Sequence, residues 1–374
     1  MKKLLLLFSL FMVGILISSD VLGQRISQFR GRRMPFAKNK RYLSVGFTVN
    51  AFNYFGDLTP QSHFASTSVS YTRPGVGVTG MYRMGPRSFM RGNFMWGRLQ
   101  ADDFKADPFG EDSKYRYVRN LHFRNDIKEL SLEYVFDFIP HHRTFITRPQ
   151  LIPFVSVGLA IFHHNPKAKV PSVDAYHYNI GNAQPIEEND LRYGGVSPGD
   201  WIALKPLGTE GQYIENSGVE PYSNWQFAIP LGAGVRYRLN RFVDISFELS
   251  YHQTFTDYLD DVSGLYVNPE EFGDTPEANL ARLMADRSKE PFAALSGEER
   301  DLNYIREHIN GTHLYGQVPP DFGDLPYELI SGYGSRGTEE FPNIRGKDDW
   351  DVYLVTKFQL TYIIGTNIRN AKFR

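Results

Sequence analysis

Residues 243–255 read VDISFELSYHQTF, and apolar and polar side chains alternate along this stretch, with Gln253 the one polar residue on the apolar side. Because successive side chains of a β-strand point to opposite faces, the stretch predicts a strand with one apolar and one polar face. A soluble sandwich would bury the apolar face. A membrane barrel would turn the apolar face to lipid and line its lumen with the polar face. The rest of the chain has to distinguish these two folds.

The N-terminal stretch predicts export. Lys2 and Lys3 precede an apolar run over residues 4–17, and small and polar residues follow before Gln24. This arrangement is typical of a secretory signal peptide, here over residues 1–23, and is too short for a membrane anchor. The chain contains no Cys, which excludes disulfides and thiolate-ligated metals. No later segment reaches the roughly 18 consecutive apolar residues of a membrane helix, so a membrane-spanning form requires a closed barrel.

Alternating stretches recur through the mature chain. Together with residues 243–255 they give eight predicted strands, the other seven at residues 43–50, 75–82, 90–96, 129–138, 154–161, 227–238 and 352–364. The connections after the first, third, fifth and seventh strands are long, and the others are short. This parity is typical of outer-membrane barrels, whose short turns face the periplasm. We therefore predict an all-β fold over residues 42–366, an eight-stranded antiparallel up-and-down transmembrane β-barrel with long extracellular loops.

Two local features qualify this prediction. Pro153 and Pro230 fall inside predicted strands and are expected at bulges, because a closed barrel has no edge to host a missing donor. The long loops cover residues 164–224 and 257–347, and the second contains signals for short helices. Asp274 can cap a helix that begins near Pro276. Ser296 with Glu299 forms a capping box for another helix before Leu302, Ile305 and Ile309.

Positive charge gathers on the predicted periplasmic side. A basic tail at residues 24–41, the three short turns with their flanks, and the C-terminal residues 367–374 carry 17 Lys or Arg and no Asp or Glu, although the net charge of the chain is −1. Attraction to anionic phospholipid explains such a rim, and docking of an acidic periplasmic partner also explains it. The candidate partner contacts are Arg30, Arg32, Arg33, Arg87, Arg143, Arg148, Arg241, Arg369 and Lys372.

The predicted lumen also contains charges. Eight strands leave an interior just wide enough for side chains to fill, and buried charges persist only when they are paired. We therefore expect a salt-bridged plug and no passive transport through the barrel. The residues of this lumen charge network are Arg91, Glu129, Glu133, Arg236, Glu248 and Lys357.

Possible chemistry centres on His252, which shares the lumen face with Thr254 and Glu248. Eight-stranded lipid A deacylases carry a His, a Ser two residues on and a Glu in a comparable place, so a nucleophile with a base is one interpretation. A structural, hydrogen-bonded histidine is the preferred one. The adjacent pairs His141–His142 and His163–His164 predict no shared metal, because neighbours on a strand point to opposite faces.

Asp257, Asp260 and Asp261 lie near a predicted loop mouth and have a spacing that could supply oxygen ligands to Ca²⁺. Solvated loop carboxylates are the preferred interpretation. The sequence contains no phosphate-binding glycine loop, metalloprotease motif or nucleic-acid signature. We therefore expect no catalytic residues, no cofactor, no small-molecule substrate and no nucleic acid.

Several stretches resemble the PorG family, the outer-membrane barrel components of the Bacteroidota type IX secretion system. They are NYFGDL at 53–58, RPG at 73–75, NLHFRN at 120–125, LKPLGTEG at 204–211, FAIPLG at 227–232 and TFTDYLDDVS at 254–263. The resemblance implies a non-enzymatic protein of the Gram-negative cell outer membrane. It further implies that the barrel anchors a periplasmic ring of proteins resembling PorK and PorN. A lipid A hydrolase, or an adhesin or receptor acting through the long acidic loops, are the alternatives.

Overall fold

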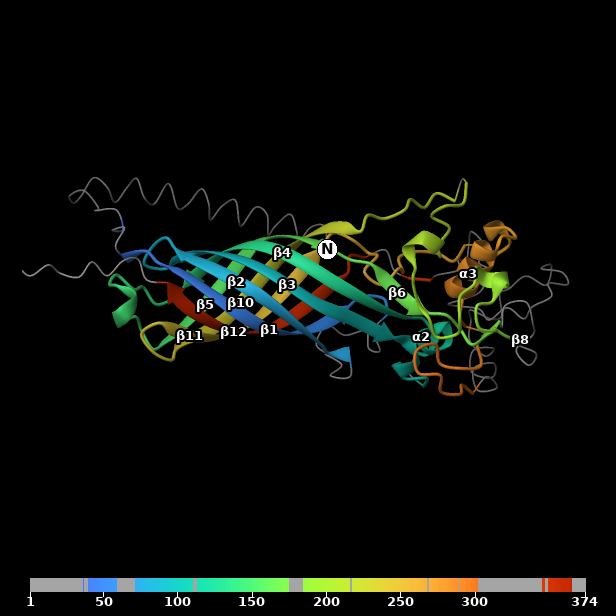
Figure 1. Ribbon diagram of the computed structural model, residues 1–374, viewed down its shortest axis with the longest axis horizontal. Helices are drawn as coiled ribbons and strands as arrows, with labels where there is room; N and C mark the ends of the chain where they lie inside the picture. Colours follow the sequence, from blue (N-terminus) through green and yellow to red (C-terminus); the bar gives the residue numbers. More distant parts are fainter. Residues whose placement is uncertain are drawn as a thin grey trace, which may run out of the picture.

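The computed structural model describes residues 36, 40–58, 71–109, 113–174, 184–215, 217–267, 269–288, 290–301, 345–346 and 349–364. Eight long antiparallel strands close into a barrel, because they run in the order β3-β2-β1-β12-β11-β10-β5-β4 and β3 also pairs with β4 (Figure 1). The predicted eight-stranded barrel is confirmed. Its strands are β1 (Leu43–Phe55), β2 (Arg73–Arg83), β3 (Ser88–Asp102), β4 (His122–Asp137), β5 (Leu151–His163), β10 (Trp225–Arg238), β11 (Val243–Thr254) and β12 (Val352–Ile364).

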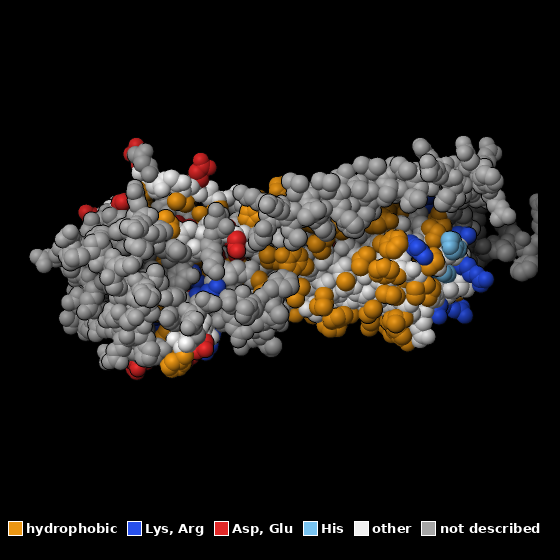
Figure 2. All heavy atoms as spheres, turned by 180° about the vertical axis from the view of Figure 1, so that it is seen from behind, with side chains coloured by type: hydrophobic (Ala, Val, Ile, Leu, Met, Phe, Trp, Pro, Cys, Tyr) orange, Lys and Arg blue, Asp and Glu red, His pale blue; other side chains and the backbone are white. Residues whose placement is uncertain are grey.

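The alternation of side chains sets the two faces of the barrel wall. In β11, Asp244, Ser246 and Glu248 are buried in the lumen, whereas Ile245, Phe247 and Leu249 are exposed on the outside. The same holds around the barrel, so that Leu159 is 70% exposed. A broad apolar band therefore covers the outer surface, which Figure 2 shows from the side opposite to Figure 1. This inversion of the usual pattern is typical of a barrel whose outside faces lipid.

The connections differ at the two ends of the barrel. β2 to β3, β4 to β5 and β10 to β11 are joined by short turns, one of which contains the 3₁₀ helix η5 (Phe145–Thr147). The four remaining connections are long, and all leave the opposite end. We refer to these as the turn end and the loop end.

The described parts of the loops fold into a cap over the loop end (Figure 1). β6 (Pro166–Lys169) pairs with β4 near its start, at Arg124 and Asn125, and β9 (Trp201–Ala203) pairs with β6, so the cap continues the barrel sheet. The cap has an apolar core, formed by Ala168, Val170, Ile186, Tyr193, Leu204, Leu280, Leu283 and Met284. Its other elements are η4 (Asp103–Lys105), α2 (Lys114–Arg119), β7 (Val173–Asp174), β8 (Gln184–Pro185), η6 (Leu191–Tyr193), η7 (Lys205–Leu207), η8 (Pro269–Phe272) and α3 (Pro276–Ala285).

The predicted helix near Pro276 is present as α3, but its N-cap is Thr275 and not Asp274. The Thr275 side chain accepts a hydrogen bond from the Ala278 N–H at 3.2 Å. Thr275 directly precedes the first helical residue, so its hydroxyl reaches the free N–H groups of the first turn. The capping box predicted for the second helix is absent. Residues 296–301 are not helical: the Ser296 hydroxyl accepts from the Glu298 N–H at 3.3 Å, and Glu299 forms an isolated bridge with Phe292. Leu302, Ile305 and Ile309 lie outside the described residues.

The expectation of bulges at the two prolines is wrong. Pro153 lies opposite Val235, and Pro230 lies opposite His252, in registers that do not shift on either side. The β5–β10 pairing is interrupted only beside Ile229 and Pro230. A proline removes a donor from the ladder without adding a residue, so the register is kept. Among the described residues, no helix has the length and hydropathy that crossing a membrane would require.

Candidate functional site

The middle of the lumen contains a layer of paired charges. Arg91 donates to Glu248 Oε2 through Nη1 at 2.5 Å and to Glu133 Oε2 through Nε at 3.1 Å. Lys357 Nζ lies 3.7 Å from Glu133 Oε1 and 3.9 Å from Glu248 Oε1. All four side chains are buried. We call these four residues the charge layer, and its two cations and two anions balance.

Two other members of the predicted network lie elsewhere. Arg236 Nη1 donates to Asp137 Oδ2 at 3.1 Å, nearer the turn end. Glu129 lies nearer the loop end, where it accepts a hydrogen bond from the Tyr353 hydroxyl. Residues four apart on one strand, such as Glu129 and Glu133, are separated by about 13 Å along the strand. Alternation predicts that they share a face, but it does not predict that they share a depth.

Apolar clusters lie on both sides of the charge layer. Toward the loop end, Phe52, Phe123, Phe162 and Tyr353 belong to a buried cluster. Toward the turn end the buried residues are Tyr42, Met81, Phe89, Val135, Phe145, Phe154 and Ile363. Neither cluster was predicted, because the lumen face was expected to be polar. Their signal was the set of aromatic residues at lumen positions in predicted strands, such as Phe154 and Tyr353. The filled interior favours a plug over a water-filled pore.

The possible catalytic set is not assembled as expected. Thr254 Oγ1 donates to the Asp351 carbonyl at 2.6 Å, and Glu248 belongs to the charge layer. His252 instead contacts Ser250 Oγ through Nε2 and Glu129 Oε2 through Nδ1, both at 3.0 Å, and stacks on Tyr353 with ring centroids 4.7 Å apart. Ser250, His252 and Glu129 have no exposed surface. The Ser250 hydroxyl is thus closed to a substrate acyl group in this structure, and the hydrogen-bonded, enclosed His252 fits the structural interpretation.

Buried arginines join the loops of the cap to one another. Arg345 Nη1 donates to Glu210 Oε1 at 2.9 Å and Arg345 Nε to the Ala285 carbonyl at 3.2 Å. Arg119 Nε donates to Asp103 Oδ2 at 2.7 Å, and Arg119 Nη2 donates to the Asp57 carbonyl at 2.8 Å. Arg287 donates to the Lys169 carbonyl and to Glu290 of its own loop, and Arg300 donates to the Glu290 and Val118 carbonyls. These arginines were not predicted to be structural, since nothing in the local sequence distinguishes them from solvated loop residues.

The mouth aspartates are neither solvated nor arranged for calcium. Asp260 Oδ1 accepts from the Val262 N–H at 3.0 Å, and Asp261 Oδ1 accepts from the Tyr222 hydroxyl at 2.7 Å. Asp257, Asp260 and Asp261 are all buried. No three His, Asp or Glu side chains among the described residues are arranged to hold a metal ion, and this includes both histidine pairs. The carboxyl groups of Asp260 and Asp261 are thus each directed to their own protein partners.

One of the mouth carboxyl groups must be protonated. The Tyr54 hydroxyl lies 2.7 Å from Asp260 Oδ2 and 2.6 Å from Asp351 Oδ1. A phenol has one hydrogen, so it can donate to only one of these oxygens, and the other carboxyl group has to donate to the phenol. Burial, and then the neighbouring carboxylates, raise the pKa values of Asp260 and Asp351 well above their ordinary range. Burial also raises the pKa of Asp257 to about 10.

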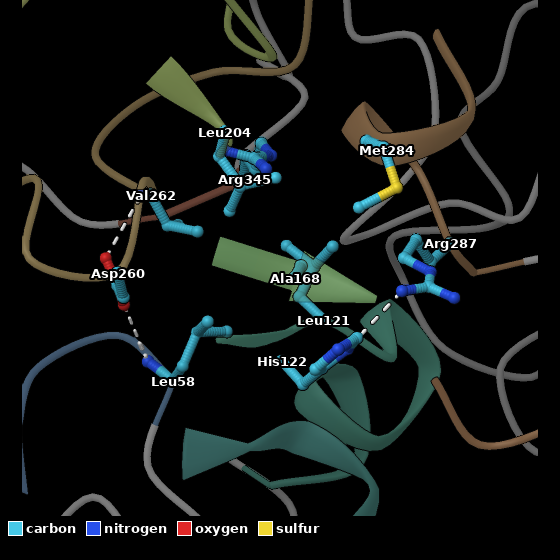
Figure 3. A pocket seen from close by; sticks show the side chains of 10 residues that line it. All are labelled: Leu58, Leu121, His122, Ala168, Leu204, Asp260, Val262, Met284, Arg287 and Arg345. Atoms are coloured by element: carbon cyan, nitrogen blue, oxygen red, sulfur yellow. Dashed lines mark hydrogen bonds between the residues drawn. The ribbon is translucent and has the colours of Figure 1, made fainter. Parts of the chain in front are cut away.

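A small cavity lies between the barrel and the cap (Figure 3). Leu58, Leu121 and Met284 line it together with the hydrogen-bonded pair His122 and Arg287. Its volume is about 10 Å³, the space of about one water molecule. The cavity is therefore a packing defect under the cap and has no room for an organic ligand.

The turn end exposes Arg87, Arg143 and Arg241, which we call the basic rim. None of these three side chains forms a hydrogen bond or ion pair with a described residue. The acids at this end, Asp137 and Asp244, are buried and paired with arginines. Basic and histidine side chains therefore gather at this end of the surface in Figure 2.

Arg148 does not belong to the basic rim. It is only 3% exposed, and its Nε donates to Asp244 Oδ1 at 3.0 Å. Its Nη1 donates to the Phe145 and Arg241 carbonyls, both at 2.7 Å. This guanidinium closes the turn end of the barrel. The prediction that Arg148 contacts a partner is therefore wrong, because its side chain is buried. The signal peptide, the basic tail with Arg30, Arg32 and Arg33, and Arg369 and Lys372 lie outside the described residues.

The geometry defines the class of protein, a closed eight-stranded antiparallel β-barrel with an apolar outer surface. A family model described as a domain of unknown function, DUF6089, matches residues 34–177. No curated protein matches the chain.

Solved outer-membrane proteins are among the structures that match the chain, at low identity and low TM-score. The crystal structure of Neisserial surface protein A (NspA) is 8% identical, covers 86% of this chain and 96% of its own, and gives a TM-score of 0.31. The N-terminal β-barrel domain of Pseudomonas aeruginosa OprF is 8% identical over 85% of this chain and 97% of its own, with a TM-score of 0.27. A major outer membrane protein from Thermus thermophilus is 10% identical over 86% of this chain and 99% of its own, with a TM-score of 0.29.

Proposed function

We propose that this protein is a non-enzymatic barrel of the outer membrane that anchors a periplasmic assembly through its basic rim. The observation that carries the proposal is the state of the charges at the turn end. Arg87, Arg143 and Arg241 are exposed, whereas the acids beside them are buried and neutralised. Such a one-signed surface steers and orients an acidic partner.

The outer wall, the lumen and the cap of the described barrel also support this proposal, because they favour a membrane location and disfavour the alternative functions. The apolar band suits an outer-membrane location. The filled lumen and the bonded cap argue against a channel, and the enclosed His252 argues against a lipid A hydrolase. The resemblance to the PorG family supplies the partner for the proposal, a ring of periplasmic proteins resembling PorK and PorN. In this proposal the turn end faces the periplasm and the cap faces outward.

The test is a set of charge reversals in the full-length protein in its own cells. Arg87→Glu, Arg143→Glu and Arg241→Glu are made singly and together, and the tagged barrel is purified from outer membranes in mild detergent. The ring proteins that accompany it are quantified by mass spectrometry. The control is Lys105→Glu, which reverses a half-exposed cation at the loop end, 3.8 Å from Glu298. Heat-modifiable migration on gels checks that each barrel is folded.

We expect the triple variant to lose at least nine-tenths of the ring proteins and the single variants to lose part of them. The control is expected to match the wild type. Raising the salt concentration should weaken the wild-type complex, because exposed charges are screened beyond roughly 3 Å at 1 M ionic strength. Undiminished recovery with the folded triple variant would refute anchoring through the basic rim.

A further inference from the structure

The outward-facing charges of the barrel wall lie on one side. In the eight barrel strands, all of which the structure describes, the charged side chains exposed or half-buried on the outer face are Arg98 on β3 and Arg124, Asp126 and Lys128 on β4. Asp102, at the end of β3, has the same parity but is buried. The outer faces of β1, β11 and β12 are uncharged along their whole length. The charges are therefore confined to a sector of the wall and do not form a ring at one depth.

This sector begins where the apolar band ends. Trp96, Lys128, His163 and Trp225 lie in register across β3, β4, β5 and β10, with the His163 and Trp225 rings 5.2 Å apart. Below this row the outer face is apolar, as at Leu130, which is 59% exposed. Tryptophans at such a boundary mark the level of lipid headgroups. Lys128 therefore lies at headgroup height.

Above the row the sector is basic. Lys167 on β6 lies opposite Arg124 on β4, and the Arg124 guanidinium stacks over the Trp201 ring at 4.2 Å. The single acid, Asp126, is already bound by Arg98 through two hydrogen bonds of 2.6 and 3.1 Å. Lys128 and Lys167 form no hydrogen bond or ion pair with any described residue, and Arg124 Nε has no hydrogen-bond partner among them. We call Arg124, Lys128 and Lys167 the cationic patch.

We propose that the cationic patch binds the phosphate groups of a phosphorylated lipid in the outer leaflet of the membrane. Three cations that form no ion pair with a described acid extend from the tryptophan row toward the cap, and Asp126, which lies between Arg124 and Lys128, is bound by Arg98. Residues four apart on a strand span about 13 Å, so Lys128 and Arg124 can meet separate phosphates of one headgroup. The Arg124–Trp201 contact holds one guanidinium in place, which lowers the entropy lost on binding. The apolar face below would contact the acyl chains of the same lipid.

This inference rests on the outer-membrane placement in the proposed function, although not on the periplasmic partner. The test uses purified full-length protein in detergent micelles and a bisphosphorylated lipid A as the probe. Its comparison lipid is the same molecule with both phosphates removed. Three of the four tryptophans, Trp96, Trp201 and Trp225, border the cationic patch, so intrinsic fluorescence reports binding. Lys128→Gln with Lys167→Gln is the variant, and Arg143→Gln with Arg241→Gln removes the same charge from the other end.

We expect the patch variant to bind the phosphorylated lipid about twentyfold more weakly, since a basic residue near an anionic surface contributes about fivefold in affinity. The rim variant should bind like the wild type, and the dephosphorylated lipid should bind all three proteins weakly and equally. Equal affinity of the patch variant and wild type would overturn the inference, and so would saturation by millimolar inorganic phosphate alone. Insertion into lipid vesicles is measured separately, and its failure would contradict the membrane placement itself.

Discussion

Replacing Arg91 by Met should destabilise the barrel more than any substitution on its outer surface. The substitution removes the hydrogen bonds from Arg91 to Glu133, Glu248 and Ser156. It leaves two buried carboxylates that share one ammonium group, Lys357 Nζ, at 3.7 and 3.9 Å. Breaking a buried ion pair from one side costs about 3–5 kcal/mol, and the remaining layer has an unbalanced negative charge. We expect the free energy of unfolding to fall by at least this amount.

A charge-balanced double variant separates charge from packing. With Arg91→Met and Glu248→Gln together, Glu133 and Lys357 remain as one ion pair, so about 2 kcal/mol of the loss should return. The assay is urea unfolding of the protein refolded in phospholipid vesicles, followed by tryptophan fluorescence and by heat-modifiable migration. A single variant within about 1 kcal/mol of the wild type would refute the reasoning. So would a double variant less stable than Arg91→Met.

Two further predictions use the same unfolding assay or proteolysis. Phe247→Arg, in the middle of the apolar band, should cost about 2–4 kcal/mol, whereas Phe255→Arg near the loop end should cost about 0–1 kcal/mol; equal costs would show that the band does not cross a bilayer. The raised pKa values of Asp260 and Asp351 mean that the folded mouth retains protons which the unfolded chain releases above about pH 4. Stability of the mouth should therefore fall as the pH rises from there toward the folded pKa values. The assay is cleavage of the cap by a protease, with its rate normalised to the cleavage of a peptide substrate at the same pH. Cleavage should be faster at pH 9 than at pH 5, and the double variant Asp260→Asn with Asp351→Asn should reduce that difference. A pH-independent rate would contradict the buried protonated pair.

The wall of the barrel could be predicted from the sequence because each strand carries its own two-residue period. The stretch from Val243 to Thr254 shows its two faces without reference to any other strand, and the parity of loop lengths then gives the up-and-down topology. The depth of a lumen side chain has no such local signal. It depends on the stagger between strands, which is why Glu129, Glu133 and Arg236 were expected in one network and lie at three levels.

Most of the cap could not be predicted from the sequence either, because it too depends on contacts that have no local signal. Its stability comes from contacts between loops that are distant in the chain, such as Arg345 with Glu210 and Arg119 with the Asp57 carbonyl. The loop aspartates were predicted to be solvated, since charged loop residues usually are. This prediction was wrong because Tyr54 and Tyr222, which lie far away in the sequence, enclose Asp260 and Asp261.

The charge layer also favours the correct alignment of the barrel strands over misaligned ones. Arg91 pairs across to Glu133 on β4, and Glu248 pairs across to Lys357 on β12, but the contact between Arg91 and Glu248 forms only when opposite walls meet at the right stagger. A slip of one residue in any of these strands would turn its charged side chain out of the lumen and toward the acyl chains. Each misplaced Arg or Lys would then cost about 2–4 kcal/mol at the bilayer centre. Misaligned closures are thus penalised, and a barrel filled only with apolar side chains would lack this penalty.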